Sequence, residues 1–106
     1  VIGLALSSPA IGEGAVAAER LGDLVMIATA AAITYHCKGY QVGKAYHADY
    51  DKLQALGSGH PDWKLFLSLT EEVEDRYGLH KSPEGCRRAL KDWGPQSHQP
   101  LVSRSR

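Results

Sequence analysis

The sequence predicts an all-α fold, a small bundle of about four helices with one disulfide bond. Four segments place apolar residues three or four positions apart, and a glycine follows close after each of them. No segment shows the alternation of apolar and polar residues that is typical of a strand. The two cysteines, Cys37 and Cys86, lie at the edges of the first and the fourth expected helix.

The first helix is expected over about residues 17–35, before a stop at Gly39. Its inward face comprises Leu21, Leu24, Val25, Ala28, Ala32 and Tyr35. The many alanines in this helix make a smooth surface, against which another helix can pack closely. The second helix is expected over about residues 42–56 and ends at the glycines that follow it. Its inward residues are Val42, Ala45, Tyr46, Leu53 and Leu56.

The third helix is expected to begin at Pro61 and to stop at Gly78. Its apolar face comprises Trp63, Phe66, Leu67, Thr70, Val73 and Tyr77, and a solvated acidic face comprises Glu71, Glu72, Glu74 and Asp75. The fourth helix follows a capping hydroxyl on Ser82, begins at Pro83 and ends before Gly94. It is expected to bury Cys86, Ala89, Leu90 and Trp93.

A chain of 106 residues corresponds to one domain, which we divide into three parts. Residues 1–15 form an extended N-terminal arm, residues 16–94 the helical domain, and residues 95–106 a flexible basic tail. The arm is apolar, but Pro9 and Gly12 interrupt it and no basic residue precedes it, so we expect a retained arm rather than a signal peptide. No apolar run approaches the ~20 residues of a membrane-spanning helix.

The charges balance, with 12 basic and 12 acidic residues. This balance lacks the basic excess of a typical nucleic-acid-binding protein, so we expect no nucleic-acid partner. Only the last part of the chain, residues 85–106, is basic, and its few cations have little aromatic interleaving.

The two cysteines are predicted to form a disulfide bond. Closing a loop of this length would stabilise the fold by about 4 kcal/mol on the chain-entropy model, and such bonds are typical of oxidising compartments. We therefore expect a periplasmic or secreted protein. Two alternatives are a pair of buried free thiols and metal ligation that involves His36 and Cys37, although the chain lacks CxxC and HxxxH spacings.

The usual signatures of catalysis and of cofactor binding are missing from the sequence. It has no GxGxxG, GxxxxGK[ST] or GxSxG motif, and its five histidines follow no common spacing. We therefore expect that the protein is not an enzyme and that it uses no cofactor.

Tyrosine and tryptophan are favoured at protein interfaces because they are large and stiff and carry a polar tip. An aromatic patch near Cys37 is therefore predicted to bind a partner, through Tyr35, Tyr40, Tyr46, Tyr50 and Trp93. The sequence thus favours a small exported protein that binds another protein, as an accessory subunit, an inhibitor or an immunity-type partner. The alternatives are a pH-responsive periplasmic chaperone and a small metal- or cofactor-binding protein that uses His36 and Cys37.

Overall fold

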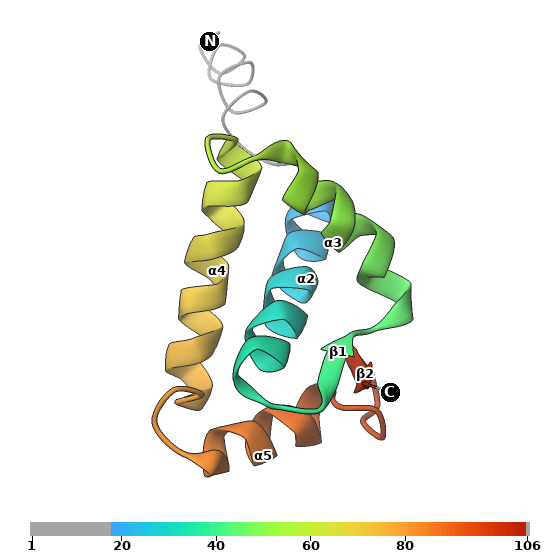
Figure 1. The fold of residues 1–106 in the computed structure, drawn as a ribbon, viewed down its shortest axis with the longest axis vertical. Coiled ribbons are helices and arrows are strands. Elements are labelled where there is room, and N and C mark those ends of the chain that lie inside the picture. Colours follow the sequence, from blue (N-terminus) through green and yellow to red (C-terminus); the bar gives the residue numbers. More distant parts are fainter. Residues whose placement is uncertain (1–17, 106) are drawn as a thin grey trace, which may run out of the picture.

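The computed structural model describes residues 18–105, which form four helices and a two-stranded antiparallel sheet. In chain order the elements are α2 (Ala18–His36), β1 (Tyr40–Val42), α3 (Lys44–Leu56), α4 (Pro61–Tyr77), α5 (Pro83–Trp93) and β2 (Val102–Arg104), as Figure 1 shows. The predicted helical fold is confirmed, and so is the disulfide between Cys37 and Cys86. The predicted N-terminal arm lies outside the described residues.

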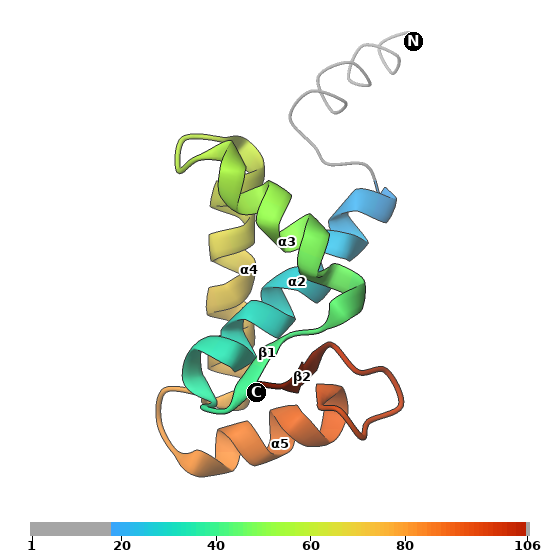
Figure 2. The same cartoon turned by 45° about the vertical axis from the view of Figure 1, so that its right-hand side comes forward.

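Helix α2 occupies the middle of the domain and packs along α4. The two helices run in the same direction, because His36 at the end of α2 pairs with Glu74 near the end of α4. Helix α3 crosses the first half of α2, and α5 lies across the C-terminal ends of α2 and α4 (Figures 1 and 2). The alanines of α2 permit this close packing, since Ala28 and Ala30 are fully buried.

The core consists of two clusters along α2. The upper cluster, at the start of α2, comprises Leu24, Ile27, Ala28, Ala31, Leu53 and Phe66. The lower cluster surrounds the disulfide and comprises Ala30, Ala32, Ile33, Cys37, Val42, Val73, Leu79, Ala89, Leu101 and Val102. Tyr46 and Tyr50 of α3 pack against both clusters and therefore connect them.

The helix ends follow the local sequence with one exception. Helix α4 begins at Pro61, and His60 caps it by accepting a hydrogen bond at Nδ1 from the Asp62 N–H over 3.1 Å. Gly78 ends α4 in the left-handed conformation, with φ of 64°. Helix α5 begins at Pro83 as expected, but the Ser82 side chain makes no capping hydrogen bond, so the predicted hydroxyl cap is not formed.

Part of the segment 95–106, which was expected to be a flexible tail, packs against the domain. Leu101 and Val102 are 0% and 1% exposed. Strand β2 pairs with β1, and the Leu101 N–H donates a hydrogen bond to the Trp93 carbonyl oxygen over 2.8 Å. The segment is polar on average, but it contains one apolar pair, Leu101 and Val102, and this pair is part of the lower cluster. The expectation that the chain has no strand fails here too, because three-residue strands are too short to show alternation.

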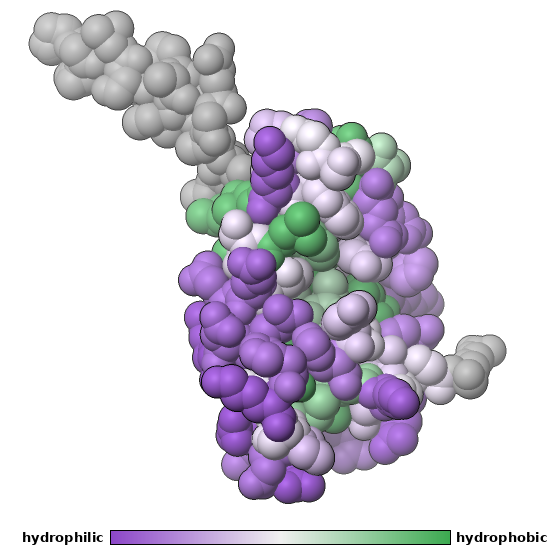
Figure 3. Space-filling model, turned by 60° about the vertical axis from the view of Figure 1, so that its left-hand side comes forward, coloured by the Kyte–Doolittle hydropathy of each residue, from purple (hydrophilic) through white to green (hydrophobic). Residues whose placement is uncertain are grey.

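Several side chains face differently from the prediction. Five residues placed on inward faces are exposed: Leu21 (39%), Tyr35 (83%), Ala45, Leu56 (41%) and Leu67 (45%). Glu74, placed on the solvated face, turns instead towards His36. The surface drawn in Figure 3 is largely hydrophilic, with a hydrophobic area in its upper part. None of the helices within residues 18–105 has the length and apolar character needed to cross a membrane.

Candidate functional site

A groove of about 490 Å³ lies between α2 and α3. This volume is within the range of ligand pockets, roughly 300–1,000 Å³. Its lining residues are Asp23, Leu24 and Ile27 from α2, and Asp49, Lys52, Leu53 and Leu56 from α3. The groove is therefore formed by four aliphatic side chains and three charged ones.

The spacing of the aliphatic residues places them in the groove. Leu24 and Ile27 are three positions apart on α2, and Leu53 and Leu56 have the same spacing on α3, so each helix directs one pair to the same side. Leu24, Ile27 and Leu53 belong to the upper cluster and are almost fully buried. Leu56 is 41% exposed. The groove therefore joins the upper cluster to the surface, and Leu56 lies at its edge.

The charged lining residues lie on both sides of the groove. Asp23 belongs to α2, whereas Asp49 and Lys52 belong to α3, and all three are exposed. Within the described part of the chain, none of the three forms an ion pair. Two carboxylates against one ammonium group give this lining a formal charge of 1 − 2 = −1. A bound cation would therefore find a carboxylate on either helix.

The predicted aromatic patch is divided in the structure. Tyr40, Tyr46, Tyr50 and Trp93 are partly buried and pack against the lower cluster. Tyr35 differs from these four, because it is 83% exposed and meets only the edge of the His36 ring, with ring centroids 5.0 Å apart. The partner-binding role of the five residues stays a prediction, but four of them contribute area to the fold.

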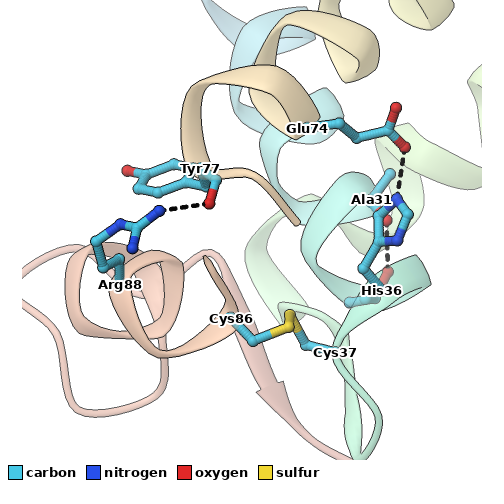
Figure 4. Close-up of a disulfide and its surroundings, with 8 residues drawn as sticks. Ala31, His36, Cys37, Glu74, Tyr77, Cys86 and Arg88 are labelled. Carbon is cyan, nitrogen blue, oxygen red and sulfur yellow. Dashed lines mark hydrogen bonds and ion pairs between the residues drawn. A yellow bond between two sulfur atoms is a disulfide. The ribbon is translucent and has the colours of Figure 1, made fainter. Parts of the chain in front are cut away.

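The disulfide and a polar cluster lie together at the lower end of α2 (Figure 4). The bond joins Cys37, just after α2, to Cys86 in α5, with the two Cα atoms 5.7 Å apart. Beside it, His36 Nε2 lies 2.7 Å from Glu74 Oε2, and these side chains are only 17% and 25% exposed. The His80 ring centroid is 6.1 Å from that of His36. This cluster connects α2 to α4, as the disulfide connects α2 to α5.

The pairing of Glu74 was missed by the sequence analysis although the sequence contains a signal for it. Glu74 lies four positions after Thr70 and three before Tyr77, so it shares their side of α4. An acid on the apolar face of a helix is an indication of a buried partner. Glu74 was assigned to the solvated face because Glu71, Glu72 and Asp75, its acidic neighbours in the sequence, face solvent.

A second polar network joins the end of α4 to α5. The Tyr77 hydroxyl donates to Asp92 Oδ2 over 2.6 Å and accepts from Trp93 Nε1 over 3.0 Å. Burial, and after it the hydrogen bond to Asp92, raise the pKa of Tyr77 above its usual value. On the outer face of α5, the hydrogen bond from Arg87 lowers the pKa of Glu84.

The metal-binding alternative finds little support in these positions. The Cys37 sulfur is bonded to Cys86, so it has no free thiolate to offer a metal ion. Among the residues described, no three His, Cys, Asp or Glu side chains converge in a way that could hold a metal.

Comparisons with protein-family models, curated proteins and solved structures give no match to this chain. The functional interpretation of the groove therefore depends on the chemistry of its own residues.

Proposed function

We propose that this protein binds another protein and that the groove between α2 and α3 is its contact surface. The observation that supports this most strongly is an open groove of about 490 Å³, which has a buried aliphatic floor of Leu24, Ile27 and Leu53. Leu56 at its edge and Leu21, one helical turn before Leu24, stay 41% and 39% exposed. Covering the exposed part of each of these side chains is favourable, although by less than the gain of about 1.5–3 kcal/mol from burying a fully exposed leucine.

The groove supports protein binding better than the predicted aromatic patch does. Tyr46, Tyr50 and Trp93 already pack against the core, so a partner could contact only their outer edges. Tyr35 is exposed on its own and serves in this proposal as a secondary contact. At the groove the apolar side chains open to a partner are Leu56 and, on α2, Leu21, since the other three aliphatic lining residues are only 3–4% exposed.

The proposal includes the compartment and the type of role. The disulfide fits an oxidising environment, and we infer a periplasmic or secreted protein on that basis. A small domain that presents one apolar groove is suited to act as an accessory subunit, an inhibitor or an immunity-type partner.

Site-specific crosslinking in the native host tests this proposal. A photoreactive residue in place of Leu56 is expected to give a covalent adduct with another protein, and Leu21→Ser in the same chain should abolish it. The matched control is a photoreactive residue in place of Leu67, which is exposed to a similar extent, 45%, but belongs to α4. An adduct from the Leu67 position and none from the Leu56 position would contradict the proposal.

A second candidate function, a pH-responsive chaperone, is favoured by the cluster of His36, Glu74 and His80. Histidines change charge between about pH 5 and 8. A proton on His36 attracts the Glu74 carboxylate at 2.7 Å, whereas a proton on His80 as well adds a repulsion across 6.1 Å. Coulomb energy falls with distance and the carboxylate is the nearer charge, so the attraction exceeds the repulsion. On this proposal the contact between α2 and α4 opens only when Glu74 itself becomes neutral.

Binding of an apolar fluorescent dye between pH 7 and pH 3 tests the second candidate. We expect no dye binding near about pH 6, where histidines titrate, and a rise only in the strongly acidic range where carboxylates take up protons. His36→Gln should move the rise towards neutral pH. The control is His47→Gln, since His47 is 61% exposed and pairs only with Asp51 of its own helix. Equal effects of both substitutions would contradict this function.

A further inference from the structure

We propose that an amphipathic α-helix of the partner occupies the groove, and that this helix carries basic residues along the two edges of its apolar face. This inference rests on the proposed function. Two properties of the groove indicate this occupant. The first is the spacing of the leucines and the isoleucine on its two sides. The second is the position of two carboxylates that form no ion pair within residues 18–105.

The geometry of the groove matches a helix better than an extended peptide. Each side is a helix that presents an aliphatic pair three residues apart, which is about 4.5 Å along the helix axis. An amphipathic helix repeats its apolar residues at three and four positions, so its ridges have the same spacing. An extended peptide that binds by strand addition needs the free backbone groups of a strand edge, and those of α2 and α3 are bonded within the helices; polyproline segments favour aromatic-lined grooves, and this lining has no aromatic residue.

Leu21 extends this match along α2. It precedes Leu24 by three positions, as Leu24 precedes Ile27, so one side of the groove continues as a row of three aliphatic side chains. On α3 the row ends with the helix at Leu56. Leu24 and Ile27 are already buried, so a partner helix with two to three turns of apolar side chains would cover Leu21 and Leu56, the two members that stay exposed.

The carboxylates of the groove predict that the partner helix carries positive charge. Asp23 on α2 and Asp49 on α3 lie on opposite sides of the aliphatic residues and form no ion pair within residues 18–105. Lys52 is the single cation among the lining residues. A lysine or arginine at either edge of the partner's apolar face would meet a carboxylate, and a glutamate there would be repelled. Pairs at the rim of an interface contribute modestly, so we expect a preference of about tenfold for the basic helix.

Fluorescence anisotropy with two synthetic peptides tests the inference on the full chain. Both peptides are 18-residue helices with leucines on one face, and they differ only in having lysine or glutamate along the edges. The lysine peptide is expected to bind about tenfold more tightly than the glutamate peptide, and added salt should reduce this preference. Leu56→Ser should weaken both by about tenfold, whereas Leu67→Ser, the matched exposed leucine of α4, should change neither.

Two further substitutions test the carboxylates separately. The double variant Asp23→Asn, Asp49→Asn is expected to remove most of the preference for lysine while the glutamate peptide binds as well or better. The control is Asp51→Asn, because Asp51 is an exposed acid of the same helix that pairs with His47 and does not line the groove.

The remaining outcomes separate this inference from the proposed function. Equal binding of both peptides, weakened by Leu56→Ser, would overturn the charge of the partner and leave protein binding intact. Failure of both peptides to bind, with the crosslink from position 56 preserved, would overturn the helical partner alone. Conversion of a dimer to a monomer by Leu56→Ser, measured by sedimentation, would identify the occupant as a second copy. An equal effect of Leu67→Ser would overturn both proposals.

Discussion

The strongest test of the fold is the replacement of both Cys37 and Cys86 by serine. The two residues are 49 positions apart, and on the chain-entropy model a loop of that length stabilises the folded state by about 4 kcal/mol. The free energy of unfolding of a folded protein is about 5–15 kcal/mol, so the loss of the disulfide removes a large share of it. The double variant should therefore unfold at much lower urea concentration.

The loss should be greatest at one end of the molecule. The disulfide joins the end of α2 to α5, and β2 follows α5 in the chain. Without the bond, α5 and β2 depend on the packing of a few side chains, chiefly Ala89, Leu101 and Val102. The upper cluster contains no part of α5 or β2. The helices that form it should therefore unfold at a higher urea concentration than α5 and β2.

The two tryptophans allow the two ends to be measured separately. Trp63 packs against the upper cluster and Trp93 against the lower one, so Trp93→Phe leaves a probe of the first and Trp63→Phe a probe of the second. In the oxidised protein both probes should report one transition. In the cysteine variant the Trp93 signal should change at lower urea than the Trp63 signal, and a reductant should have no further effect.

Two results would refute this reasoning. A loss below about 1 kcal/mol would mean that the bond constrains the unfolded chain far less than the model requires. Coincident transitions of Trp63 and Trp93 in the variant would mean that α5 is held by its packing rather than by the disulfide.

Three other substitutions test particular contacts, with urea unfolding as the measurement. Gly85→Ala should cost about 1–3 kcal/mol, because its Cβ would lie 2.5 Å from the Tyr77 carbonyl oxygen. Gly22→Ala is the control, since its Cβ meets nothing within 4 Å, and it should stabilise α2 by up to about 1 kcal/mol. Burial and its hydrogen bond raise the pKa of Tyr77, so the unfolded chain loses this proton first and the free energy of unfolding should fall above about pH 10. Tyr77→Phe should lack this alkaline decline, and an unchanged decline would contradict the assignment. Leu101→Ala should cost about 2–5 kcal/mol, because this side chain is 0% exposed, whereas Gln99→Ala, at an exposed position nearby, should cost little.

The helices and the disulfide could be predicted because their signals are local. The spacing of apolar residues, Pro61 and Pro83 at helix starts and the stop at Gly78 all act within a few residues. The position of the cysteines at two helix edges required only that the first and fourth helices be neighbours. These features depend little on how the rest of the chain folds.

The features that the sequence did not reveal depend on distant partners. Leu101 and Val102 are buried because α2, β1 and α5 leave an apolar space that two residues of a polar segment can fill. Composition averaged over that segment cannot show this. The pairing of β1 with β2 likewise joins residues about sixty positions apart in the sequence.

The partner-binding role of the tyrosines stays a prediction, because residue type alone does not distinguish an interface from a small core. Helix α3 has a single fully buried residue, Leu53, and it attaches to the domain mainly through the half-buried rings of Tyr46 and Tyr50. Three of the four aliphatic residues of the groove, Leu24, Leu53 and Leu56, were expected to face inward, whereas Ile27 was not singled out. That Leu56 remains open to solvent depends on how α3 crosses α2, which no local pattern specifies.

Methyl-resolved NMR of the intact protein with the lysine peptide is the most direct test of the proposed groove. We expect the methyl signals of Leu56, Leu53, Leu24 and Ile27 to shift on addition of the peptide, while those of Leu67 and Leu101 stay in place. Shifts centred on Leu67, with unchanged signals from the four lining residues, would contradict the assignment of the groove as the binding surface.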